Sequence, residues 1–65
     1  MFCRFTNFRN DSIFIDVDKI VCFFYNENYK LTEIHMDNKE ILRVQDTPDQ
    51  IAEDLYNLYY KKKSK

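Results

Sequence analysis

Three side chains of this 65-residue chain could bind a metal or act as nucleophiles, namely Cys3, Cys22 and His35. Each stands alone in the sequence, whereas zinc ligands come in closely spaced cysteine or histidine pairs. A Cys–His catalytic pair would also need an oxyanion hole, and turns without glycine supply paired backbone N–H groups poorly. We therefore predict neither a metal site nor a nucleophilic centre. His35 is expected to face solvent or to contact a neighbouring strand.

Paired carboxylates occur at Asp16/Asp18 and at Glu53/Asp54. The first pair is typical of a turn in which Asp16 bonds to the local backbone, and the second is typical of a solvated helix face. The chain also has no glycine, which excludes the phosphate-binding loops, dinucleotide fingerprints and nucleophile elbows that depend on it. We expect a protein that is not an enzyme and needs no cofactor.

Arginine and aromatic residues offer a different chemistry, that of ligand binding. In the segment 3–9, cationic, polar and aromatic residues are interleaved, and a strand would place Arg4 and Phe8 on one face. Guanidinium and aromatic groups grip nucleotide-like anions by charge and stacking, but the same residues also build subunit interfaces. The residues predicted to bind such a ligand are Arg4, Phe8, Arg9, Tyr25, Arg43, Tyr56 and Tyr60.

The charge of the chain is unevenly distributed. Four of its ten basic residues, Lys61, Lys62, Lys63 and Lys65, lie at the C-terminus, so residues 1–60 hold six basic against eleven acidic residues. This acidic body argues against nucleic-acid binding, which needs a basic face. The basic tail (61–65) could touch nucleic acid or a membrane surface, or could simply end and solubilise a helix whose dipole favours lysine there.

Turn residues divide residues 1–46 into short runs of strand-forming residues. The corners are 9–11, 26–28 and 37–39, with a further bend at 16–18, and we expect Asn or Asp to replace glycine at each tight corner. The connections are short enough for antiparallel hairpins. The predicted strands are Phe2–Phe8, Ser12–Ile15, Lys19–Tyr25, Tyr29–Met36 and Glu40–Gln45.

The last segment has helical periodicity. Thr47 is the expected N-cap, Pro48 the first helical residue and Gln50 the partner in a capping box. Ile51, Leu55 and Leu58 form the buried stripe, with Ala52 and Tyr59 beside it and Tyr56 and Tyr60 on its flank. We predict an α+β, mainly β fold over residues 1–60, a five-stranded, curled antiparallel meander with one C-terminal helix.

The third run is apolar on both faces, since residues 20–25 read Ile-Val-Cys-Phe-Phe-Tyr. A single helix covers one face of a sheet, so the other face is covered by curling into a barrel or by a second subunit, or its aromatic residues lie partly exposed at a rim. Eleven Phe and Tyr residues exceed what so small a core encloses. We therefore expect a homo-oligomer.

From about Phe5 to Leu55 the order of features resembles the small FlbD-type flagellar proteins. The bend at 12–20, the hairpin at 37–44 and the start of the helix at 47–51 carry the resemblance. The Asn-Gly turns and the Pro-Asp-Thr hairpin of that family are missing here. The resemblance implies a β-meander closed by a helix, and a small regulatory module.

No signal peptide and no apolar stretch of membrane-spanning length are found, so we expect a cytoplasmic protein with reduced cysteines. Cys3 and Cys22 could each pack in the core or an interface, form a disulfide or act as a reactive thiol. The composition is typical of phage accessory proteins. We expect a homo-oligomeric anti-defence inhibitor that sequesters a nucleotide-type immune signal or blocks a host protein. The alternative is an FlbD-like module acting through a protein partner or nucleic acid.

Overall fold

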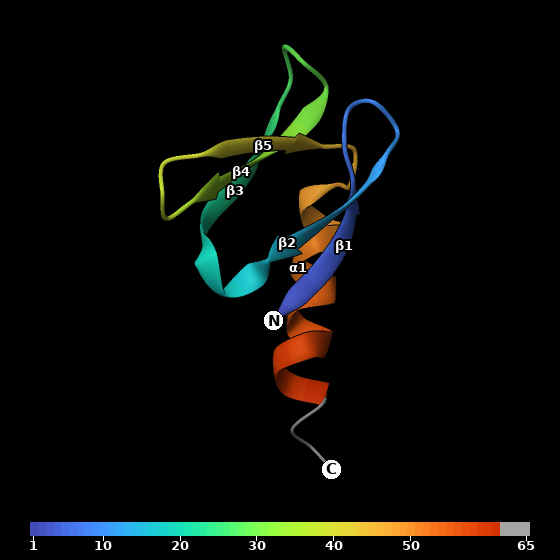
Figure 1. Ribbon diagram of the computed structural model, residues 1–65. Helices are drawn as coiled ribbons and strands as arrows, with labels where there is room; N and C mark the ends of the chain where they lie inside the picture. Colours follow the sequence, from blue (N-terminus) through green and yellow to red (C-terminus); the bar gives the residue numbers. More distant parts are fainter. Residues whose placement is uncertain (62–65) are drawn as a thin grey trace.

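The computed structural model describes residues 1–61, whose chain forms five strands, two short helical turns and one α-helix (Figure 1). The basic tail predicted at 61–65 falls outside the described residues from 62 onward. The elements in chain order are β1 (Phe2–Thr6), β2 (Ser12–Asp16), the 3-10 helix η1 (Val17–Lys19), β3 (Ile20–Asn26), β4 (Leu31–Met36), β5 (Ile41–Val44), α1 (Pro48–Tyr56) and the π-helical turn η2 (Asn57–Lys61).

The strands form two antiparallel sheets, one of β1 and β2 and one in the order β3-β4-β5. The mainly β fold with a C-terminal helix is confirmed, but the single five-stranded meander is not. Backbone pairing joins the two sheets where β1 and β5 end, through a bridge between Asn7 and Val44 and a bond from Gln45 N to Thr6 O of 2.7 Å. Pairing goes no further because β1 ends at Thr6, where the chain begins to turn.

That turn corrects the prediction that Arg4 and Phe8 share a strand face. The side-chain Oδ1 of Asn7 accepts the backbone N–H groups of Arg9 and Asp11, each at 2.9 Å. A side chain bonded in this way holds the backbone in a turn and competes with strand pairing. Phe8 therefore lies in the hairpin loop and not in β1.

The tight turns differ from the prediction that Asn or Asp takes the place of glycine in each of them. Within residues 1–61, three residues have positive φ, Asn10 (69°), Lys30 (57°) and Lys39 (71°), so asparagine occupies only one of these three left-handed positions. In the other two turns the asparagine accepts backbone N–H groups instead: Asn26 Oδ1 from Asn28 and Asn38 Oδ1 from Glu40. The bend at Asp16 is confirmed, since its Oδ1 accepts the N–H of Asp18 at 3.2 Å within η1.

The helix begins as predicted. Thr47 Oγ1 accepts the N–H of Gln50 at 3.1 Å and Pro48 occupies the first turn. The capping box is only half formed, because the Gln50 side chain donates to Asp54 Oδ1 and not to Thr47. Ile51 is fully buried, whereas Ala52 is exposed.

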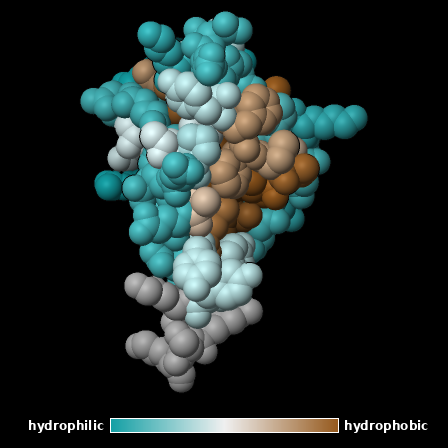
Figure 2. Space-filling model, turned by 180° about the vertical axis from the view of Figure 1, so that it is seen from behind, coloured by the Kyte–Doolittle hydropathy of each residue, from teal (hydrophilic) through white to brown (hydrophobic). Residues whose placement is uncertain are grey.

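The core lies between the inner faces of the two sheets and α1. Seen from behind, apolar side chains still form a continuous area in the middle of the molecule (Figure 2), so one short helix leaves part of the apolar surface open. No helix within residues 1–61 has both the length and the apolar character to cross a membrane. The buried core residues are Phe5, Ile15, Val17, Ile34, Val44 and Ile51.

Candidate functional site

The outer face of the β3-β4-β5 sheet, opposite the core, carries a group of polar and aromatic side chains. Side chains alternate between the faces of a strand, and the register places Phe24, Glu33 and Arg43 side by side across the three strands. Thr32 and Ile34, the neighbours of Glu33 in β4, are buried on the inner face. We call the group the Glu33 cluster; its members are Phe24, Asn26, Tyr29, Glu33, His35 and Arg43.

Glu33 is the centre of the cluster and is only 7% exposed, although α1 packs its buried Ile51 against the opposite, inner face of the sheet. Its Oε2 accepts a hydrogen bond from Asn26 Nδ2 at 2.9 Å and one from Arg43 Nε at 3.3 Å. Its Oε1 lies 3.4 Å from Nε2 of His35. These donors, that of Asn26 first and those of His35 and Arg43 after it, lower the pKa of Glu33 against the opposing effect of its burial.

Arg43 is held from two sides. Its Nε binds Glu33, and its guanidinium carbon lies 4.6 Å from the centroid of the Tyr29 ring, in the β3–β4 hairpin. A guanidinium has five N–H donors, and within residues 1–60 Arg43 makes no side-chain hydrogen bond besides that of Nε. The side chain remains 39% exposed. Its two terminal nitrogens are therefore positioned and available to an incoming acceptor.

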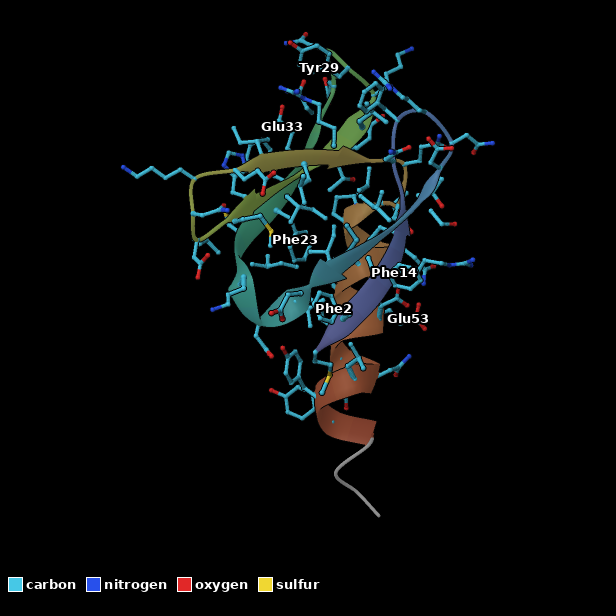
Figure 3. All side chains as sticks on the ribbon, in the orientation of Figure 1. Phe2, Phe14, Phe23, Tyr29, Glu33 and Glu53 are labelled. Atoms are coloured by element: carbon cyan, nitrogen blue, oxygen red, sulfur yellow. The ribbon has the colours of Figure 1, made fainter. Side chains whose placement is uncertain are left out.

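Aromatic and apolar side chains surround these polar groups. Phe24 lies with its ring centroid 5.1 Å from that of His35, at an interplanar angle of 30°. Phe24, Tyr29 and Ile41 are all exposed large apolar side chains. The labelled Tyr29 and Glu33 lie at the end of the molecule away from the helix C-terminus (Figure 3).

This arrangement suits binding better than proton transfer. A carboxylate with a lowered pKa stays ionised at neutral pH and is a poor proton donor, and three partners already contact its oxygens, which hinders their use as a general base. An oriented guanidinium beside flat aromatic surfaces can instead bind an anionic group and stack on a planar ring. The cluster is therefore a candidate site for an anionic ligand that carries a ring.

The residues predicted to form one ligand site lie on different elements. Arg43 is part of the Glu33 cluster, but Tyr25 pairs with Thr32 and so points to the opposite face of the sheet. Arg4 is exposed on β1, and Arg9 lies over the Phe8 ring, 5.4 Å from its centroid, in the β1–β2 turn. Tyr56 and Tyr60 stack on each other along the helix, with centroids 4.9 Å apart. Of the seven predicted residues, only Arg43 takes part in the Glu33 cluster.

Sequence reasoning missed Glu33, Asn26 and Tyr29. The alternation in Leu31–Met36 was a usable signal, because it places Glu33 and His35 on one face of a strand whose other face carries Thr32, Ile34 and Met36. The pairing of Glu33 with Arg43 required the register of the β4–β5 hairpin. Asn26 and Tyr29 join the cluster only because the β3–β4 turn brings them back over the sheet.

The side chains of Asp16 and Asp18 contact the N-terminal amino group and the C-terminal end of the helix. The amino group of Met1 lies 3.2 Å from Asp16 Oδ1 and 3.0 Å from Asp18 Oδ2. The hydroxyl of Tyr59 donates to Asp18 Oδ1 at 2.5 Å. The bond from Tyr59 and then that from the amino group lower the pKa of Asp18, and the same contact raises the pKa of Tyr59. This group ties η2 to η1 and serves the fold.

Neither cysteine forms a disulfide among the described residues. Burial is the main cause that raises the pKa of the Cys3 thiol, which keeps it protonated and unreactive. Cys22 is exposed on the outer face, opposite His35. In the part of the chain that the structure describes, no group of three or more His, Cys, Asp or Glu side chains is placed to hold a metal ion.

Compared with known proteins, the chain matches no family model, no curated protein and no solved structure. The resemblance to FlbD-type proteins therefore gains no support from these comparisons.

Proposed function

We propose that this chain is a small, non-enzymatic binding protein that recognises an anionic ligand carrying an aromatic ring, of the nucleotide type. The observation that carries the proposal is the position of Arg43. It is held by Glu33 and stacked on Tyr29, and its terminal nitrogens point to no acceptor within residues 1–60. A guanidinium fixed before binding loses little entropy when it meets a phosphate.

The neighbouring aromatic side chains support a ring in the ligand. Phe24 and Tyr29 are exposed on the same side of the sheet as Arg43. Base–aromatic stacking contributes about 1–3 kcal/mol per base in single-stranded nucleic-acid complexes, which is enough to favour a nucleotide over inorganic phosphate by about fivefold to a hundredfold.

His35 adds a flat surface to the site, because its ring centroid lies 5.1 Å from that of Phe24. Together with Phe24 and Tyr29 it can contact the ring of a nucleotide. The composition is the basis for the further proposal of a phage-encoded anti-defence inhibitor that sequesters a nucleotide immune signal in the cytoplasm, as a homo-oligomer.

Calorimetric titration with adenosine monophosphate, adenosine and inorganic phosphate tests the proposal. We expect the nucleotide to bind most tightly and Arg43→Gln to weaken it by about tenfold or more, the loss of one charged contact. Arg4→Gln is the matched control, because Arg4 is an exposed arginine on the other sheet. Equal binding by the wild type and Arg43→Gln, or a loss with Arg4→Gln alone, contradicts the assignment to this face.

A protein partner is a second candidate, favoured by a separate observation. Phe2 and Phe14 are 66% and 68% exposed on the β1–β2 sheet, away from the Glu33 cluster (Figure 3). Aromatic side chains exposed to this degree are typical of protein contacts. Binding to a protein partner would serve either an inhibitor that blocks a host protein or a small regulatory module of the FlbD type. It predicts that Phe2→Ser/Phe14→Ser abolishes capture of the partner and leaves nucleotide binding unchanged.

A further inference from the structure

β3 has an open edge. In the sheet order β3-β4-β5, β4 pairs with one side of β3 and no strand within residues 1–61 pairs with its other side (Figure 1). α1 packs near β3, but no backbone hydrogen bond joins the two in this range. The unpaired N–H and C=O groups of an edge strand are a template for pairing with another strand.

The sequence of β3 lacks the features that usually protect an edge. Ile20–Asn26 has seven residues, none of them charged and none proline. Val21 is 66% exposed, Phe24 46% and Tyr25 47%. The strand does contain a bulge between Ile20 and Cys22, but Cys22–Asn26 runs in regular register beyond it. β2, which also has a free side, is shorter and carries Asp11 and Asp16 at its two ends.

We propose that two copies of this chain associate by antiparallel pairing of their β3 edges, about a two-fold axis through Phe23. The charges that flank the strand select this partner. Lys19 precedes β3 and Glu27 follows it, so antiparallel pairing with its own copy brings the lysine end of each strand to the glutamate end of the other. Both are exposed, and neither forms an ion pair within residues 1–60.

An axis through Phe23 also matches the faces of the sheet. Phe24, on the outer face, lies opposite Cys22 of the second copy, which is also on the outer face, and Tyr25 lies opposite the bulge at Val21 of the second copy. A slip by one residue would place the outer face of one copy beside the inner face of the other. The result is one six-stranded sheet with a Glu33 cluster in each half of its outer face.

This inference deepens the proposed function, which expects copies of the chain to assemble. Its test measures mass without any ligand, so it can fail while nucleotide binding stands, and the reverse. In sedimentation of the full chain at micromolar to millimolar concentration, we expect a species of twice the 8.0 kDa chain mass. A monomer throughout that range overturns the proposal.

Charge reversal tests the antiparallel approach of the two charged ends. Lys19→Glu and Glu27→Lys should each raise the dimer dissociation constant by about tenfold, because each turns two attractive contacts into two repulsive ones. The double variant Lys19→Glu/Glu27→Lys restores attraction and should restore the wild-type constant. Additive weakening in the double variant overturns the pairing of the β3 edges. Circular dichroism checks that all three variants fold.

A cross-linking experiment identifies the edge directly. In a Cys3→Ala/Cys22→Ala background, oxidation of a mixture of Val21→Cys and Tyr25→Cys should give a disulfide-linked heterodimer, because opposed residues lie within disulfide reach. Each variant alone should stay unlinked.

Lysine substitution tests the same edge by charge. The double variant Val21→Lys/Tyr25→Lys should be a monomer, whereas the matched control Phe2→Lys/Phe14→Lys, on the other sheet, should remain a dimer. The opposite pattern would move the interface to the β1–β2 sheet.

Discussion

Glu33 Oε2 lies 3.3 Å from Arg43 Nε directly across the β4–β5 ladder, on the sheet face opposite the core. A carboxylate that is 7% exposed in such a place is shielded by neighbouring side chains alone. The pair therefore depends on the hairpin turn, which supplies Asn26 and Tyr29, as much as on the two strands themselves. Hairpin geometry thus fixes both the ionisation of Glu33 and the orientation of Arg43.

The first prediction concerns acid stability. The hydrogen bonds from Asn26, His35 and Arg43 lower the pKa of Glu33 below its ordinary value of 4.5. A lowered folded-state pKa means that this contribution is fully present above pH 4.5 and is lost as the pH falls through the folded-state value. Urea unfolding of the wild type should show a free energy of unfolding that declines with falling pH in this range.

Glu33→Gln separates this effect from that of other acids. The variant cannot ionise at this position, so it should be less stable at neutral pH and lose less stability between neutral pH and pH 3. Asp18 has a lowered pKa as well and contributes in both proteins, which makes the difference between the two curves the relevant quantity. Parallel curves for wild type and variant would show that Glu33 is not held ionised by its partners.

The second prediction concerns the helix end. Tyr59→Phe removes the hydroxyl that binds Asp18 and should lower the melting temperature, by less than the truncation of a core residue such as Ile51 does. Tyr60→Phe is the matched control, since Tyr60 is exposed and its hydroxyl has no protein partner within residues 1–60. Equal melting temperatures for wild type and Tyr59→Phe would contradict a stabilising contact.

The same pair predicts behaviour in alkali. Its contact with Asp18 raises the pKa of Tyr59 above the ordinary value of 10.0. A raised folded-state pKa means that the contribution is fully present below pH 10 and is lost as the pH rises through the folded-state value. Spectrophotometric titration should detect one tyrosine of the wild type that ionises later than the rest, and Tyr59→Phe should lack it.

The third prediction concerns the start of the helix. Thr47→Ala removes the oxygen that accepts the N–H of Gln50 and should cost about 1 kcal/mol of unfolding free energy. Thr47→Ser keeps that oxygen and should retain most of the stability. Chemical denaturation measures both. A Thr47→Ser variant as unstable as Thr47→Ala would assign the loss to the missing methyl group.

Local sequence patterns predicted the elements because each depends on residues close in the chain. The alternating runs gave the five strands within a few residues, and Thr47, Pro48 and Ile51 gave the start and the buried face of the helix. The division into two sheets depends on where β1 stops, and this is decided by the side-chain bonds of Asn7. The seven predicted binding residues were chosen by type, whereas the Glu33 cluster is assembled by register and turn geometry, which residue types do not encode.

The last prediction follows from a chain without glycine. Lys39 has φ of 71°, a conformation that strains any residue with a Cβ atom and that glycine adopts freely. Lys39→Gly should therefore stabilise the protein by up to about 1 kcal/mol, after the greater freedom of glycine in the unfolded chain is offset. Lys39→Ala keeps the strain and serves as the control for removal of the charge. Denaturation midpoints should rank Lys39→Gly above the wild type and Lys39→Ala at or below it. The reverse order would mean that the Lys39 side chain stabilises this turn by more than its backbone strain costs.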